Sequence, residues 1–187
     1  EKRFWSKSEK GVISIIHYLF RQFLEDNGFY KFCPEGSRNF IFVRVTNNLI
    51  DHTSEEEIKD FVLGYLEDLD DMSVYNYFAD KTRFFREEFL SLLGTVDVYF
   101  IEDDKNTAYL YYRNCAVKVT KDKKTTIDYL DLGGYVWKDQ VIDRDFDMCE
   151  SFDCDYKTFI SNIAGENKQT IKSMRSTIGF MLHAYKN

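Results

Sequence analysis

The hydrophobic pattern of this chain changes its period close to Gly94. Before that glycine, apolar side chains recur mainly at helical spacing, whereas short β-rich runs with alternating side chains follow from Val98 to Leu130. A chain with both patterns in succession is neither all helix nor all sheet. We therefore predict an α+β fold with a helix-rich N-terminal half, a central small antiparallel β-meander and C-terminal helices.

Two elements are predicted at the start of the chain. A one-sided apolar stripe that ends at Asn27-Gly28 predicts a helix over residues 11–27. The stripe consists of Val12, Ile15, Ile16, Leu19, Phe20 and Phe23. Residues 29–32 and 40–45 are rich in aromatic and β-branched side chains and flank a breaker that contains Pro34, so they predict a hairpin.

Ser54 and Glu57 have the spacing of a capping box, in which each residue's side chain bonds to the other's backbone amide. We expect a helix to begin there. Its apolar stripe would be Ile58, Phe61, Val62, Tyr65, Leu66 and Leu69. The spacing over residues 73–93 predicts one or two further helices that end at Gly94.

The second half reads as strands followed by helices. Strands are predicted at 98–101, 107–112, 116–120 and 125–130. After an acidic stretch, Asp153 or Asp155 is expected to cap a helix that runs through Ile163 and stops at Gly165. A last helix is predicted from the spacing of Ile171, Met174, Ile178, Met181, Leu182 and Tyr185.

The composition favours one folded domain, because 44% of the 187 residues are apolar and only one is proline. We expect residues 1–187 to form a single accessory domain of a larger protein, with subregions 1–95, 96–142 and 143–187. No apolar run approaches the roughly 18 residues that cross a bilayer, and no signal peptide opens the chain. A cytoplasmic protein with reduced cysteines and no membrane partner is expected.

The net charge of −7 excludes a global positive field that would draw the chain onto nucleic acid. DNA contacts must therefore come from local basic clusters, although each cluster could also be a solvated face of its own element. The predicted contacts are Lys118, Lys121, Lys123 and Lys124 of the meander, and Lys168, Lys172 and Arg175 of the last helix. The nearby Tyr109, Tyr111 and Tyr112 could form a stacking platform for single-stranded DNA or fill a core.

Two kinds of chemistry are tested directly by motif. No glycine in the chain is followed by lysine, so the P-loop that binds ATP phosphates is absent. Asp143, Asp145 and Asp147 alternate, but the sixth and twelfth positions are Met148 and Cys154, where a calcium-binding EF-hand needs Gly and Glu. The aspartates are better explained as a solvated acidic loop, and we predict no catalytic or metal-binding residue, although a two-Mg²⁺ site completed by a remote acid stays open.

Two segments resemble a known family. The run from Ala108 to Phe146 and the segment from Cys154 to Asn187 resemble the region that precedes the ATPase in superfamily-3 (AAA+) primase-helicases of Bacteroidetes phages and mobile elements. Together they cover about two fifths of the chain. Family members often carry Asn-Gly in the tight turn for which this chain has Asn114-Cys115.

The resemblance implies a ring-forming replicative helicase in which this segment lies N-terminal to the motor. ATP and Mg²⁺ would then bind only the motor domain, and no cofactor is expected in this segment. The expected function is a non-catalytic accessory domain whose partners are DNA, the motor domain and further copies of the chain. The alternatives are a divergent Mg²⁺-dependent primase or nuclease-like unit and a pure protein-interaction module.

Overall fold

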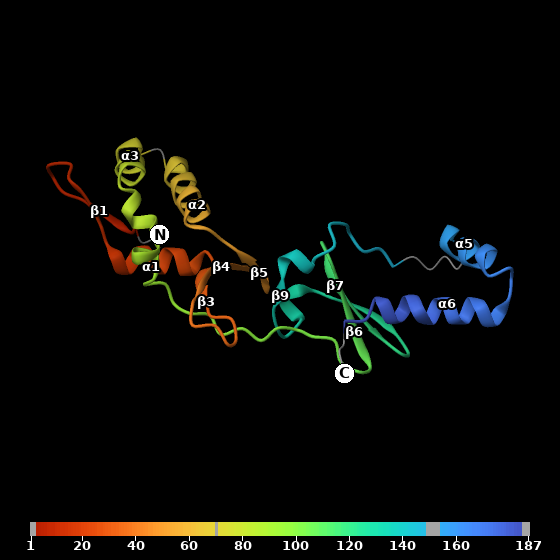
Figure 1. The fold of residues 1–187 in the computed structure, drawn as a ribbon. Coiled ribbons are helices and arrows are strands. Elements are labelled where there is room, and N and C mark those ends of the chain that lie inside the picture. The colour runs from red at the N-terminus through yellow and green to blue at the C-terminus, as the bar shows by residue number, and fades with distance from the viewer. Residues whose placement is uncertain (1–2, 70, 149–153, 185–187) are drawn as a thin grey trace. The chain divides into compact units, whose positions relative to one another are not determined.

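The computed structural model describes residues 3–69, 71–148 and 154–184. The chain divides into two compact units, whose elements are labelled in Figure 1. The first unit comprises residues 1–99 with 134–138, and the second comprises 100–133 with 139–187. These units cut across the three predicted subregions, because the segment 134–138 returns to the first unit as a strand.

The first unit mixes helices with strands. In chain order it contains β1 (Trp5–Lys7), β2 (Ile13–Ile15), α1 (His17–Asp26), β3 (Phe29–Phe32), β4 (Ile41–Thr46), β5 (Leu49–His52), α2 (Glu55–Asp68), α3 (Met72–Asp80), the 3-10 helix η1 (Thr82–Phe85), α4 (Glu87–Leu90) and β9 (Val136–Trp137). The α+β class is therefore confirmed, but the prediction of a helix-rich N-terminal half is wrong. Strands alternate with helices there because several aromatic and β-branched stretches pair as sheets.

The helix predicted over 11–27 is also too long. Residues 13–15 form β2, which pairs antiparallel with β1 so that Trp5 faces Ile15, and the helix begins only at His17. The run from Val12 to Ile16 is almost entirely β-branched, and such side chains lose rotamer freedom in a helix but pack well in a strand.

The predicted hairpin is confirmed as β3 and β4, and β5 and β9 extend it into a four-stranded sheet of order β3-β4-β5-β9. β4 and β5 are joined by Asn47 and Asn48, which both have positive φ values of 50° and 61°. Two such residues are typical of the type I′ turn that matches strand twist. β9 joins parallel to β5, with Ile50 opposite Trp137.

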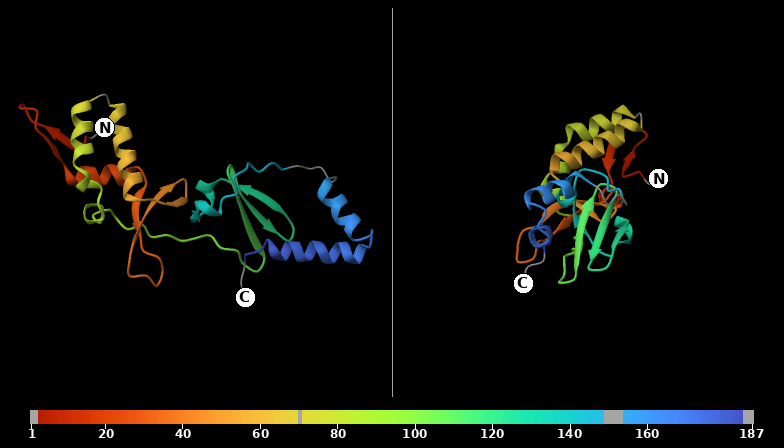
Figure 2. Two further views of the ribbon diagram at one scale, coloured as in Figure 1. Left: turned by 45° about the horizontal axis from the view of Figure 1, so that its top comes forward. Right: turned by 90° about the vertical axis from the view of Figure 1, so that its right-hand side faces the viewer.

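The capping box at α2 is confirmed. The Ser54 hydroxyl accepts from the Glu57 amide at 3.2 Å, and the Glu57 carboxylate accepts from the Ser54 amide at 2.7 Å. α2 lies beside α3, as both views of Figure 2 show, and buries Ile58, Val62 and Leu66. The surrounding core is rich in aromatic side chains: Phe4, Trp5, Phe20, Phe29, Phe78, Phe84 and Phe85.

The second unit is built on a three-stranded antiparallel meander of β6 (Thr107–Tyr112), β7 (Cys115–Thr120) and β8 (Lys124–Ile127). The meander is confirmed, except that residues 98–101, all within the described chain, do not form a strand. Tyr99 is 73% exposed, and the boundary between the units follows it. The register pairs Tyr112 with Cys115, so the tight turn is Arg113-Asn114 rather than Asn114-Cys115.

Two short 3-10 helices, η2 (Tyr129–Asp131) and η3 (Lys138–Gln140), precede the helices α5 (Asp155–Ile163) and α6 (Lys168–Met181). Asp155 is the first residue of α5 and not its cap, while Asp153 and Tyr185 lie outside the described residues. α5 ends as predicted before Gly165, which together with Glu166 has positive φ. Their left-handed conformations turn the chain into α6.

Candidate nucleic-acid interface

The C-terminal basic cluster lies along one face of α6. The Asn167 side chain caps this helix by accepting from the amides of Gln169 and Thr170 at 2.9 and 3.1 Å. Lys168, Lys172 and Arg175 follow at spacings of four and three residues, which places them on the same side of a helix. The structure thus brings together the three basic residues that the sequence predicts there.

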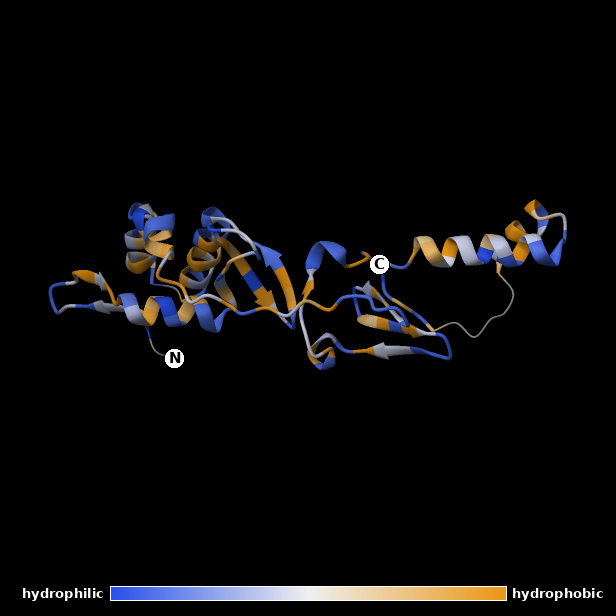
Figure 3. Cartoon of the chain, turned by 60° about the horizontal axis from the view of Figure 1, so that its bottom comes forward, coloured by the Kyte–Doolittle hydropathy of each residue, from blue (hydrophilic) through white to orange (hydrophobic). Residues whose placement is uncertain are grey.

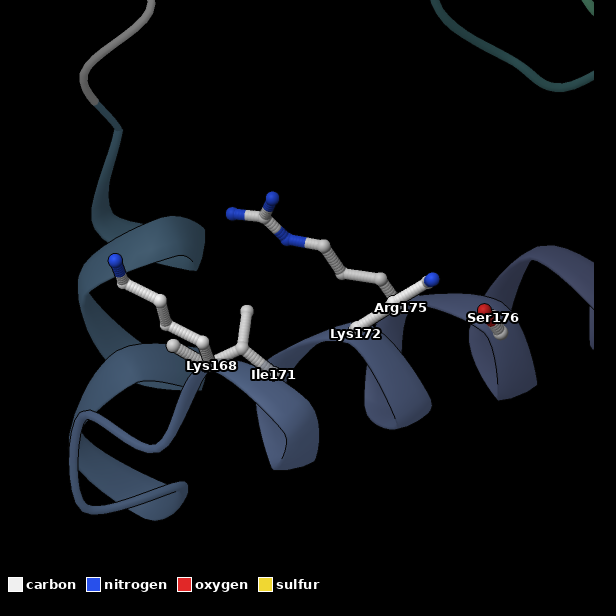
Figure 4. Close-up of a pocket in the computed structure, with 5 residues that line it drawn as sticks. All are labelled: Lys168, Ile171, Lys172, Arg175 and Ser176. Atoms are coloured by element: carbon white, nitrogen blue, oxygen red, sulfur yellow. The ribbon is translucent and has the colours of Figure 1, made fainter.

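These side chains border an open hollow of about 560 Å³, which Ile171 and Ser176 also line. The Lys168 and Arg175 side chains extend to the same side of the helix, with Ile171 between their bases (Figure 4). An apolar side chain between cations excludes some water from their charges, and this strengthens their attraction to a bound anion.

The charges around this hollow are unbalanced. The first turn of α6 contains no acid, and in the part of the chain that the structure describes no ion pair involves Lys168, Lys172 or Arg175. The N-terminal end of a helix is the positive end of its dipole, so a cation there is electrostatically unfavourable. An anion bound in the hollow would relieve both the mutual repulsion and the dipole term.

The meander cluster divides between the two faces of its sheet. Lys118 faces Tyr109 across β6 and β7, and its ammonium lies 5.8 Å from the ring centroid of that tyrosine. Lys124 is opposite Val119 and therefore projects from the other face. Lys121 and Lys123 occupy the turn between β7 and β8, where the Lys123 carbonyl accepts from the Thr120 amide at 2.9 Å.

A further lysine that the sequence did not single out joins this end of the sheet. Lys105 precedes β6 and lines, with Lys121, an open groove of about 410 Å³ between the sheet and α6. The groove also contains Gly179 and Leu182 from the C-terminal end of α6. Only the pairing of β6 with β7 brings Lys105 close to Lys121, so local sequence gave no signal for it.

The hollow and the groove lie at opposite ends of α6 and are lined by the same face of this helix. Lys168, Lys172, Arg175, Gly179 and Leu182 are separated by four, three, four and three residues, which is the repeat of one helix face. At 1.5 Å per residue the stripe runs roughly 21 Å. The hollow and the lysine-rimmed groove therefore lie one after the other along the same face of α6.

The tyrosines of β6 mainly fill the interior. Tyr111 and Tyr112 are 9% and 8% exposed, and the Tyr129 hydroxyl donates to the Tyr112 carbonyl at 2.6 Å. Burial raises the pKa of Tyr129 to about 12. Tyr109 stacks on Tyr111 at 6.4 Å, beside a hollow that Glu102 and Asp103 also line. These carboxylates make that face unfavourable for a phosphate backbone.

Two aspartates of the acidic stretch, Asp143 and Asp145, form ion pairs with an arginine. Arg113 Nε donates to Asp145 Oδ1 at 2.8 Å, and Arg113 Nη1 lies 3.8 Å from Asp143 Oδ1. Within the described residues no group of three His, Cys, Asp or Glu side chains is placed to hold a metal ion. Cys33, Cys115 and Cys154 carry thiols outside any disulfide, while Cys149 lies outside the described residues.

No helix in the described part of the chain is both long and apolar enough to cross a membrane. Comparisons with protein-family models, with curated proteins and with solved structures gave no match to this chain. The assignment of a nucleic-acid interface therefore rests on the geometry and charge of these residues alone.

Proposed function

We propose that this chain is a non-catalytic accessory domain that engages DNA for a replicative primase-helicase. The observation that carries DNA engagement is the single face of α6 on which Lys168, Lys172 and Arg175 have no carboxylate partner among the described residues. Phosphate contacts of this kind bind without reading sequence. The assignment to a primase-helicase comes from the resemblance of residues 108–146 and 154–187 to that family.

The net charge of −7 agrees with a weak, local mode of binding. A protein with an acidic surface repels DNA over most of its area, so contact is limited to local basic surfaces such as the face of α6. In a ring, several weak contacts on one strand add through effective concentration, and the assembly holds DNA while each subunit can still release it. An accessory domain of a moving helicase needs this combination.

The test is a charge reversal on α6. We expect Lys168→Glu, Lys172→Glu and Arg175→Glu together to weaken binding of single-stranded and forked DNA in fluorescence-anisotropy titrations. Because three phosphate contacts are lost, the slope of log Kobs against log salt should become shallower by about 2. In the full-length protein, the same changes should reduce unwinding of forked DNA more than they reduce ATP hydrolysis measured without DNA.

A matched control changes the same amount of charge elsewhere. Lys10→Glu, Arg38→Glu and Lys59→Glu lie in the first unit and lower the net charge equally. We expect this variant to retain most of the binding and the original salt slope. Equal losses in both variants would show that net charge alone governs binding, and would contradict an interface on α6.

A second candidate function, self-association, is favoured by an exposed apolar stripe on α5. Tyr156, Phe159 and Ile163 are 48%, 58% and 57% exposed and are spaced by three and four residues, so they share a face. In Figure 3 this helix, which follows the grey trace, carries orange hydrophobic segments beside blue hydrophilic ones. Such stripes commonly mark protein interfaces. Sedimentation velocity of the wild type and Phe159→Glu tests this, since self-association through α5 predicts a concentration-dependent oligomer that the variant loses.

A further inference from the structure

The groove at the C-terminal end of α6 has an apolar floor. Ala108 and Leu110 of β6 and Val119 of β7 project from the same face of the meander, as their register shows, and Leu182 at the C-cap of α6 also lines the groove. The volume of about 410 Å³ falls within the range of roughly 300–1,000 Å³ typical of small-ligand sites. The groove is therefore large enough for one flat organic group.

Hydrogen bonds between the residues that follow α6 and the segment that leads into β6 hold the walls of the groove together. Asp103 accepts from the Ala184 amide at 2.8 Å and from the Tyr109 amide at 2.8 Å. The His183 Nε2 atom lies 3.1 Å from the Asp104 carbonyl oxygen and 3.3 Å from that of Thr107. The end of α6 is therefore fastened to the sheet, so the groove is formed before any ligand binds.

The polar groups at the rim suit an anionic ligand. Lys105 and Lys121 border the groove, and neither forms an ion pair within the described residues. The Asp104 carboxylate is not among the lining residues, and it accepts from the Asn106 amide at 2.7 Å, which holds the backbone of Asn106 in place. Asn106 also lines the groove, and an asparagine side chain offers an amide donor and an acceptor.

We infer that this groove accepts one unstacked base of single-stranded DNA, with the flanking phosphates at Lys105 and Lys121. The inference rests on the proposed function, because the strand would reach the groove along the basic face of α6. An apolar slot with the Asn106 amide at its edge and two lysines at its rim matches a base attached to its phosphates. Bases of an intact duplex are stacked and paired, so the groove would favour single strands.

Gly179 gives a sharp test of this inference. It is an exposed helical residue of α6 that lines the groove, and a Cβ atom added there meets no atom within 4 Å. Gly179→Leu therefore places a side chain in the groove without a clash, and leucine also favours the helix more than glycine. Gly64→Leu is the matched control, since Gly64 is exposed on α2 of the first unit and also meets no atom within 4 Å.

The measurement compares two probes in anisotropy titrations of the 187-residue chain: a single-stranded oligothymidylate and an abasic oligonucleotide of the same length. Both carry the same phosphates, but only the first has bases. We expect the wild type to bind the oligothymidylate about fivefold more tightly, which corresponds to roughly 1 kcal/mol. Gly179→Leu should abolish this preference while leaving the affinity for the abasic strand unchanged, and Gly64→Leu should keep it.

The outcomes separate the two proposals. Salt-sensitive binding of both probes with equal affinity, or a preference that survives Gly179→Leu, would overturn the base-accepting groove and leave the phosphate contacts of α6 standing. If neither probe binds, the proposed DNA engagement itself fails. Loss of abasic-strand binding in Gly179→Leu would also overturn the inference, because the groove would then act on the backbone and not on a base.

Discussion

Arg113 and Asp145 form an ion pair across 32 residues of sequence, with Nε donating to Oδ1 at 2.8 Å. The pair ties the turn between β6 and β7 to the acidic run, and the Asn114 side chain adds bonds to Phe146 at 2.8 and 3.0 Å. The hydrogen bond from Arg113 lowers the pKa of the Asp145 carboxyl. Two of the acids that sequence spacing offers for a metal thus have a cationic partner.

This ion pair predicts a pH-dependent contribution to stability. A carboxyl group whose pKa is lowered by folding stabilises the fold above its unfolded pKa, and the contribution is lost as the pH falls through the folded pKa. We therefore expect Arg113→Gln to lower the urea midpoint slightly at pH 7 and hardly at all at pH 2.5. The effect is small because both side chains are exposed.

Arg38→Gln serves as the control for that experiment, because within the described residues Arg38 takes part in no ion pair. Its urea midpoint should follow the wild type at both pH values. If the urea midpoint of Arg113→Gln is as far below the wild-type value at pH 2.5 as at pH 7, the arginine acts through packing and not through the Asp145 charge.

The capping box predicts the next effect. Ser54→Ala removes the acceptor for the Glu57 amide, and we expect it to reduce the free energy of unfolding by about 1 kcal/mol. Ser54→Thr keeps a hydroxyl at the same position and should lose much less. Circular dichroism at 222 nm during urea titration measures both variants, and equal losses would show that the hydroxyl does not cap α2.

Sequence predicted the elements whose signals are local. The Ser54 cap and the β3–β4 and β6–β7 pairings are encoded by neighbouring residues, and the structure confirms them. Where two local signals compete, prediction failed: Ile13 and Ile15 suit both a helical stripe and a strand, and only pairing with Trp5 and Lys7 decides between them.

The candidate site was predictable in part. Lys168, Lys172 and Arg175 share a helix face that their spacing alone reveals. The groove could not be predicted, because it forms only when the end of α6 meets a sheet face some 60 to 75 residues earlier in the chain. That tertiary contact places Lys105 and Asn106 at the rim of the groove. No local sequence pattern predicts this position.

At Gly28, the addition of a single methyl group is expected to lower the stability of the fold strongly. Its φ of +86° lies in the left-handed region, and a Cβ atom there would stand 2.2 Å from the Val45 carbonyl oxygen. We expect Gly28→Ala to cost more than about 2 kcal/mol in unfolding free energy, because both the backbone and the neighbouring strand must shift. Circular dichroism recorded during urea denaturation of the 187-residue chain measures this loss of unfolding free energy.

Gly36→Ala separates the two causes. Gly36 has a similar φ of +75°, but nothing lies within 4 Å of its added Cβ atom. Its loss should be limited to the conformational cost of roughly 1 kcal/mol. If both substitutions cost the same, close approach of Val45 contributes nothing, and the left-handed conformation alone explains the requirement for glycine.

The register of the meander separates lysines that are close in sequence. Lys118 projects beside Tyr109, whereas Lys124 projects from the face that carries Val119 and the groove. If DNA follows α6 to the groove, Lys121→Gln and Lys124→Gln should each make the salt slope shallower by about 0.7, the value of one phosphate on a single strand. Lys118→Gln should leave the slope unchanged, since its ammonium lies on the opposite face. Anisotropy titrations of the three variants at several salt concentrations measure these slopes, and an equal reduction by Lys118→Gln would place the strand across the sheet edge rather than along the groove.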